Sequence, residues 1–150
     1  MFKKNKKQSE KDTYLITSPD KKHGKIDFKE VYRHIRTNIE YSTVGKNVKA
    51  INVTSSIPSE SKSTTSLNLA MIYATKYANV LLIDADLRRP TQHHYLKLSN
   101  SRGLTNALIE YGETKKISSK YFQFIEDESF EGKLSVLTAG IKVPNPSELI

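Results

Sequence analysis

Two apolar stretches separated by one helix-length segment restrict the fold of this chain more than any other feature. Residues 48–55, VKAINVTS, are typical of a strand, and residues 79–86, NVLLIDAD, form a near-continuous apolar run that ends in acids. Such a run is typical of a strand buried on both faces of a parallel sheet. Residues 62–77 carry apolar side chains on more than one side, which indicates a buried helix. Strand, helix and strand at this spacing predict a right-handed βαβ unit and an α/β fold.

The other segments fit helices and one more strand. Residues 27–42 carry apolar side chains at spacings of three and four, with Asp27 as the expected N-cap. The remaining expectations are helices at 103–111 and 117–125, a strand at 133–140 and a helix that begins near 145. Three strands are few for an open α/β sheet, so we expect further strands to follow in the complete protein.

Basic residues are concentrated at the start of the chain. The formal net charge is +8, and five lysines fall within the first eleven residues. We therefore expect residues 1–25 to form a flexible basic arm that meets anionic lipid or an acidic partner, or stays a solvated tail. No DNA- or RNA-binding motif accompanies these lysines, so nucleic acid is not expected as a partner. The lack of cysteine and of any apolar run of membrane-spanning length fits a cytoplasmic protein.

The loop between the first strand and the helix has the arrangement of a phosphate site. Within SSIPSESKST, a strand end feeds a helix start, where backbone N–H groups converge and the helix terminus adds partial positive charge. Lys62 stands where a lysine neutralises phosphate oxygens, and Ser63 stands where a hydroxyl ligates Mg²⁺. Thr64 adds a second hydroxyl. Ser61 occupies a position that favours glycine, because the backbone there approaches the phosphate and takes positive φ.

Asp84 and Asp86 end the second apolar strand. In open α/β sheets the carboxyl ends of the strands carry the ligand, and two carboxylates there hold Mg²⁺ or accept a proton from a substrate hydroxyl. Each motif alone has another interpretation. The lysine loop could belong to a serine-capped surface helix, and the two acids could form ion pairs with Arg88 and Arg89. Their occurrence in one strand–helix–strand unit favours a nucleotide site.

These segments together resemble the bacterial tyrosine kinases of capsular and exopolysaccharide synthesis. SSIPSESKST resembles the Walker A motif of that family, and VLLIDADLRRPTQHHYLKLSNSRGLTNAL resembles its Walker A′ motif and the following segment. LSVLTAGIKVPNPSELI resembles a family segment that ends in Pro-Asn-Pro-Ser-Glu-Leu, although Val143 replaces a usual proline. EVYRHIR matches the Glu-x-x-Arg-x-x-Arg motif through Glu30, Arg33 and Arg36. The resemblance extends from about residue 26 to the end.

The resemblance implies a P-loop NTPase-type fold over 26–150, with a parallel sheet, flanking helices and ATP and Mg²⁺ as cofactors. It implies transfer of the ATP γ-phosphoryl group to protein tyrosine, with a membrane-anchored activator as partner at the inner face of the membrane. Lys62, Asp84 and Asp86 are then the catalytic candidates, Ser63 joins the two acids at the metal, and Glu30, Arg33 and Arg36 contact another subunit of a ring. The ATP-binding positions implied are Pro58, Ser59, Glu60, Ser61, Lys62, Ser63 and Thr64.

Four departures from the family pattern matter, and we expect an impaired kinase. Ser61 replaces the glycine before the lysine, and a non-glycine residue at positive φ costs about 1–3 kcal/mol. The hydrophobic Walker B strand and the C-terminal tyrosine cluster do not appear, so we expect a chain truncated before Walker B. Ser59 replaces a glycine that varies among members.

Three other interpretations stay open at this point. One is a non-catalytic module that docks on the membrane activator or on an intact kinase. Another is a partitioning ATPase of the ParA/MinD type, although the second lysine typical of that loop has no counterpart at Ser56, Ile57 or Pro58. The third is a decayed fragment that aggregates through an exposed sheet edge.

Overall fold

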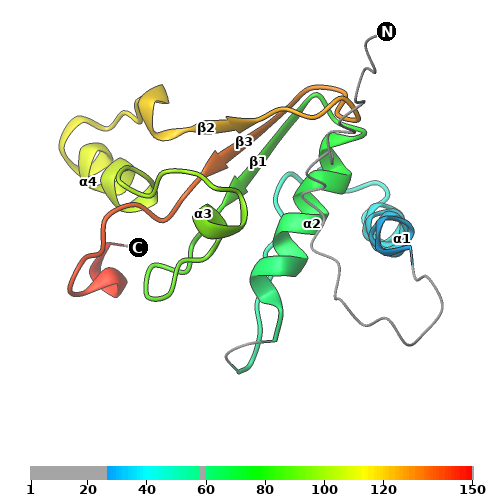
Figure 1. Cartoon of the computed structure of the whole chain (residues 1–150), viewed down its shortest axis with the longest axis horizontal. Helices are drawn as coiled ribbons and strands as arrows, with labels where there is room; N and C mark the ends of the chain where they lie inside the picture. Colours follow the sequence, from blue (N-terminus) through cyan, green and yellow to red (C-terminus); the bar gives the residue numbers. More distant parts are fainter. Residues whose placement is uncertain (1–26, 58–59, 150) are drawn as a thin grey trace, which may run out of the picture.

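The described part of the chain forms a three-stranded sheet with helices packed beside it (Figure 1). The structure is a computed structural model that describes residues 27–57 and 60–149, so the expected basic arm at 1–25 lies outside the described residues. The strands are β1 (Asn79–Ile83), β2 (Gln123–Ile125) and β3 (Lys133–Leu137). The helices are α1 (Phe28–Ser42), α2 (Lys62–Ala74), α3 (Gln92–Tyr95) and α4 (Leu104–Thr114), with 3₁₀ turns η1 (Ser119–Tyr121) and η2 (Pro146–Glu148).

The sheet is mixed, in the order β1-β3-β2. β1 runs parallel to β3, with Asn79 opposite Lys133 and Ile83 opposite Leu137, whereas β2 is antiparallel to β3. The helix predicted at 117–125 is therefore wrong, because this segment forms η1 and β2 instead. Pairing with β3 satisfies its backbone and buries Ile125 in the core, and this tertiary gain outweighs the local helical pattern.

The strand predicted at 48–55 is also wrong. The structure assigns no regular secondary structure to residues 47–55, and among the described residues no strand pairs with the outer edge of β1. A strand exists only when a neighbour accepts and donates its backbone hydrogen bonds. Here a cavity separates the segment from β1, so the βαβ unit predicted from sequence lacks its first strand.

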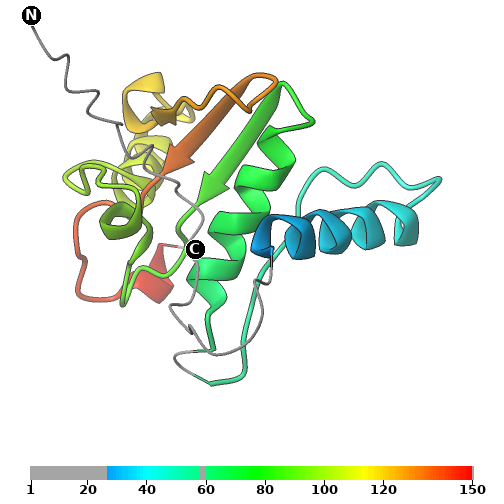
Figure 2. The same ribbon diagram turned by 45° about the vertical axis from the view of Figure 1, so that its right-hand side comes forward.

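Helix α2 lies between the sheet and α1 (Figures 1 and 2). Its buried side chains pack with Leu82, Leu134 and Val136 in the main core. Leu137, the next residue of β3, points to the opposite face and packs with Ala107 of α4. The predicted flanking helices are therefore present on both faces near this end of β3. The prediction that the strand at 79–86 is buried on both faces is wrong, because Leu81 and Ile83 of β1 stay half-exposed on the face away from α2.

Helix α1 begins as the sequence predicts, and it docks through polar contacts. The Asp27 side chain accepts hydrogen bonds from the backbone N–H groups of Lys29 and Glu30, although α1 buries none of its own residues. At its other end, Glu40 accepts hydrogen bonds from Lys76 and Tyr77 just beyond α2. Partial burial acts to raise the pKa of Glu40, but these hydrogen bonds outweigh it and the pKa lies below its usual value. Within the described ranges no helix is long and apolar enough to cross a bilayer.

Candidate functional site

The loop lysine and the strand acids meet where β1 ends. Lys62 is the first residue of α2, and its Nζ lies 3.1 Å from Oδ2 of Asp86, which follows β1 by three residues. Their side chains are 34% and 27% exposed, so the ion pair is open to a ligand from solvent. The structure thus brings together two positions that the sequence linked only through separate patterns.

Asp86 is held as a carboxylate. Partial burial acts to raise its pKa, but hydrogen bonds from the Arg89 backbone N–H and the Lys62 ammonium, with the charge of that ammonium, outweigh it. The pKa of Asp86 therefore lies below its usual value. A carboxylate that stays ionised near neutral pH suits a hard cation such as Mg²⁺.

Asp84 plays a different structural part from Asp86. It is only 5% exposed, and its Oδ2 accepts hydrogen bonds from the backbone N–H groups of Thr91 and Gln92, each at 3.1 Å. Its Oδ1 accepts a third, from the Asp86 N–H at 3.2 Å. Both oxygens are thus engaged in folding the loop that presents Asp86.

Ser61 adopts the backbone conformation that the sequence predicts for its position. Its φ is 58° and its ψ is 19°, which is the left-handed region, and its side chain makes no capping hydrogen bond to α2. A non-glycine residue there costs about 1–3 kcal/mol. The serine therefore adds strain at the point where the chain enters α2.

Glu60 occupies the backbone N–H groups of the loop. Its Oε2 accepts hydrogen bonds from the N–H groups of Ser56 at 3.2 Å and Ile57 at 3.4 Å. These N–H groups belong to the loop that the sequence assigns to phosphate, and they point at a carboxylate in this structure. Pro58 and Ser59, two of the predicted ATP-binding positions, lie outside the described residues.

Gln92 joins the two halves of the site, and sequence reasoning missed it. The residue is 3% exposed, and its Nε2 donates to the Ser63 carbonyl at 2.9 Å and to Ser66 Oγ at 3.0 Å. Its own N–H binds Asp84. In a single sequence, a glutamine after Thr91 carries no signal that distinguishes it from a surface residue.

The residues at this end of β1 fit a magnesium–phosphate site. Among the described residues no group of three or more histidine, cysteine, aspartate or glutamate side chains could hold a metal alone. Mg²⁺ in nucleotide sites takes only one or two carboxylates and completes its shell with phosphate oxygens and water. Asp86 and the Ser63 hydroxyl have oxygen atoms that could serve as ligands of this kind, and Lys62 carries a positive charge that could bind phosphate.

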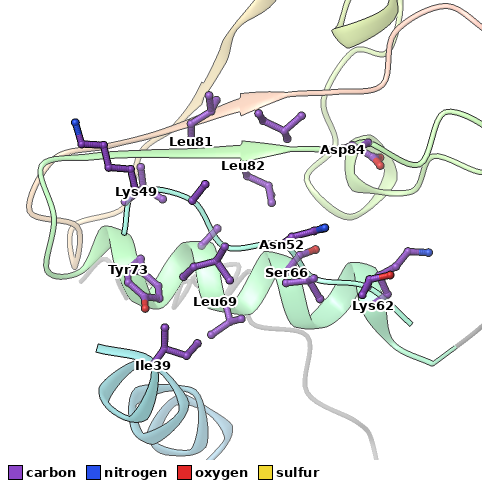
Figure 3. Close-up of a pocket in the computed structure, with 18 of the residues that line it drawn as sticks. Ile39, Lys49, Asn52, Lys62, Ser66, Leu69, Tyr73, Leu81, Leu82 and Asp84 are labelled. Carbon is purple, nitrogen blue, oxygen red and sulfur yellow. The ribbon is translucent and has the colours of Figure 1, made fainter. Parts of the chain in front are cut away.

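A cavity of about 1300 Å³ extends from this polar end along α2 (Figure 3). Lys62, Ser66 and Asp84 lie at one end, while Leu69, Tyr73 and Leu81 line it further along. The irregular segment that includes Lys49 and Asn52 also lines the cavity. The cavity is therefore polar where the lysine and acids lie and mostly apolar elsewhere.

The predicted subunit-contact residues lie on α1, away from Lys62 and Asp86. Glu30 and Arg33 form an exposed ion pair of 3.2 Å, as expected for residues three apart on a helix. Arg36 instead turns toward α2, where its Nη1 donates to the Ile72 carbonyl at 2.9 Å, and its side chain is only 15% exposed. Glu30 and Arg33 are thus exposed on α1, whereas Arg36 fixes α1 to α2.

Comparison with known proteins relates this chain to bacterial tyrosine kinases. No protein-family model matches the chain. It is 47% identical over 121 residues to the tyrosine-protein kinase YwqD of Bacillus subtilis. This alignment covers 81% of this chain and 48% of YwqD. It is 35% identical over 122 residues to the tyrosine-protein kinase CpsD of Streptococcus agalactiae. This alignment covers 81% of this chain and 49% of CpsD. The chain thus spans about half the length of these relatives.

Solved structures agree with the sequence relatives. The crystal structure of the chimerical protein CapA2B2 matches with a TM-score of 0.65 and 34% identity, over 85% of this chain and 53% of that one. Other matching structures are tyrosine-kinase domains at 30% and 33% identity. The predicted α/β P-loop class is thereby confirmed.

Proposed function

Because this chain belongs to the bacterial tyrosine-kinase family, we propose that it carries ATP-binding machinery of a tyrosine-protein kinase of capsular or exopolysaccharide synthesis. In the proposed reaction, the γ-phosphoryl group of ATP passes to a protein tyrosine hydroxyl. The observation that carries the proposal is the 3.1 Å ion pair between Lys62 and Asp86 at the carboxyl end of β1. Ligands of α/β sheets bind at this end of the strands.

Each residue of the site has a part in the proposal. Lys62 leaves Asp86 and binds phosphate oxygens, and Thr64 contributes a hydroxyl nearby. Ser63 and Asp86 hold Mg²⁺, which neutralises charge on the transferring phosphoryl group when bound. The hydrogen bonds at both oxygens of Asp84 support a loop-holding role for that acid. Asp86 is the more exposed carboxylate of the two, which supports its role at the metal.

Ser61 is the reason to expect weak activity. Its left-handed backbone is strained, and its Cβ occupies space that a glycine would leave to the phosphate. We therefore propose that the chain binds ATP more weakly than a variant with glycine at this position. This strain also favours a second candidate function, a non-catalytic module that docks on the membrane activator or on an intact kinase.

The setting proposed for this activity is the inner face of the cell membrane. A membrane-anchored activator is the proposed partner, and the basic residues 1–25 supply charge for a peripheral contact with anionic lipid. The exposed Glu30–Arg33 pair on α1 supports a contact with another subunit of a ring. The chain itself is proposed to be cytoplasmic.

Nucleotide titration tests the proposal directly. Isothermal titration calorimetry with ADP and Mg²⁺ compares the chain with Ser61→Gly and Lys62→Met. We expect Ser61→Gly to bind most tightly, the unchanged chain more weakly and Lys62→Met not measurably. Circular dichroism establishes that each variant is folded. Equal affinity in all three would exclude this loop as the phosphate site.

Phosphotyrosine labelling separates the two candidate functions. With Mg-ATP and the membrane activator, we expect weak labelling from the chain and stronger labelling from Ser61→Gly. Strong labelling by the unchanged chain that Lys62→Met abolishes would contradict the impairment. Co-purification with the activator without any labelling, even from Ser61→Gly, would favour the docking module.

A further inference from the structure

Gln92 has a buried side-chain amide of which only the nitrogen is hydrogen-bonded to the described residues. Its Nε2 makes two hydrogen bonds to α2, but its Oε1 is fully buried and accepts no hydrogen bond from the described residues. Buried polar atoms nearly always have a partner, and a buried acceptor without one destabilises the fold. An acceptor left open beside a site therefore indicates a place for a hydrogen-bond donor that comes with a ligand.

The surroundings of Gln92 identify the kind of donor. Gln92 lines the same cavity as Lys62, Ser63 and Asp86, and its amide nitrogen binds the carbonyl of Ser63 itself. Its backbone N–H binds Asp84, whose other oxygen holds the N–H of Asp86. Gln92 thus contacts Ser63 directly and is linked to Asp86 through the Asp84 carboxylate; Ser63 and Asp86 are the two oxygen ligands proposed for Mg²⁺.

Magnesium in nucleotide sites usually keeps several of its waters, and each such water is a strong hydrogen-bond donor. Groups that bind metal ligands from behind fix their orientation and tune metal affinity. A neutral amide suits this role next to a cation, because its oxygen accepts a hydrogen bond without adding charge. Its nitrogen meanwhile holds the first turn of α2 in place.

We propose that Gln92 is a positioning residue for the magnesium–phosphate site, in which Nε2 sets the place of Ser63 relative to Asp84 and Oε1 accepts a hydrogen bond from metal-bound water. The proposal rests on the proposed function, since it assumes that phosphate and Mg²⁺ bind at Lys62 and Asp86. It adds a residue that links the loop half of the site to the acid half.

The test measures how much Mg²⁺ strengthens ADP binding. Calorimetric titrations with ADP, in Mg²⁺ and in EDTA, give this gain as a ratio of two affinities. They are run in the Ser61→Gly chain, where the loop strain is relieved. We expect Gln92→Leu to reduce the gain by about 10-fold and to leave the affinity in EDTA nearly unchanged.

Gln123 provides a matched control. Its Nε2 and Oε1 make two hydrogen bonds to the backbone of Ser99, at 2.8 and 3.0 Å, and it lies on β2 away from the site. Gln123→Leu removes hydrogen bonds of the same kind, so it lowers thermal stability without changing the Mg²⁺ gain. A lower gain in both variants would show a general loss of structure and would overturn the proposal.

A second variant covers the case in which Gln92→Leu does not fold. Gln92→Glu keeps the size of the side chain and an oxygen acceptor but loses the donor to the Ser63 carbonyl, so it should retain only the part of the Mg²⁺ gain that depends on Oε1. Complete loss of the gain in this folded variant contradicts the role of Oε1. An unchanged gain in Gln92→Leu overturns the inference alone, whereas no ADP binding by folded Ser61→Gly overturns it together with the proposed function.

Discussion

Asp84 and Glu60 both accept hydrogen bonds from backbone N–H groups, one in each half of the site. Asp84 is buried and binds three such groups within the loop after β1, whereas Glu60 is exposed and binds two in the loop before α2. Burial strengthens a charge-assisted hydrogen bond, and solvent weakens it. The acid half is therefore built in advance of any ligand, while the loop half is held by a carboxylate that a phosphate can displace.

The largest expected effect comes from removing the buried carboxylate. Asp84→Ala leaves the N–H groups of Asp86, Thr91 and Gln92 without their acceptor in a buried place. We expect the free energy of unfolding to fall by about 3 kcal/mol, measured by urea denaturation. Glu60→Ala, the equivalent change in the exposed half, should cost well under 1 kcal/mol. Equal losses would show that the two halves are equally ordered.

Relief of backbone strain is the next effect in size. Ser61→Gly should raise the free energy of unfolding by about 1 kcal/mol, because the strain at positive φ exceeds the entropy cost of glycine. Lys115→Gly is the matched control, since Lys115 also lies at positive φ, at the end of α4. Both variants should be stabilised, but only Ser61→Gly should bind ADP more tightly. A tighter ADP affinity in Lys115→Gly would remove the loop-specific explanation.

A smaller effect is expected from neutralising the exposed carboxylate. Glu60→Gln weakens the hold on the N–H groups of Ser56 and Ile57 and removes a negative charge near the phosphate position. We expect ADP affinity to rise about threefold by calorimetry. Glu113→Gln removes an exposed charge from α4 and should leave the affinity unchanged. No change in Glu60→Gln would mean that Glu60 does not compete with the ligand.

The smallest effect concerns pH. Because the pKa of Asp86 is lowered in the folded protein, its contribution to stability is present above the ordinary aspartate pKa and is lost as pH falls through the folded value. The Lys62–Asp86 pair is partly solvent-screened, so this contribution is below about 1 kcal/mol. Urea unfolding at a series of acid pH values should show a shallower pH dependence for Asp86→Asn. Identical pH profiles would contradict the lowered pKa.

The sequence predicted the elements whose patterns are local. The apolar stripe and the Asp27 cap located α1, and the apolar runs located β1 and β3. The predictions for residues 48–55 and 117–125 were wrong, because their structure depends on non-local contacts. Pairing with a neighbouring strand decides whether such a segment is a strand. The first found no partner strand among the described residues, and the second found β3.

The same division applies to the candidate site. The positions of Lys62 and Asp86 and the positive φ at Ser61 followed from the spacing of a loop and a strand end. The linking role of Gln92 and the turn of Arg36 into α2 did not, because each depends on carbonyl groups far away in the sequence.

The sequence by itself determined that a helix precedes the apolar strand β1, and it placed a lysine and an acid at the same end of that strand. The tertiary structure decided which carboxylate is buried and engaged and which is exposed and displaceable. Chain connectivity and side-chain periodicity act over a few residues and can be read from the sequence. Burial and the pairing of polar groups arise only when distant segments pack together.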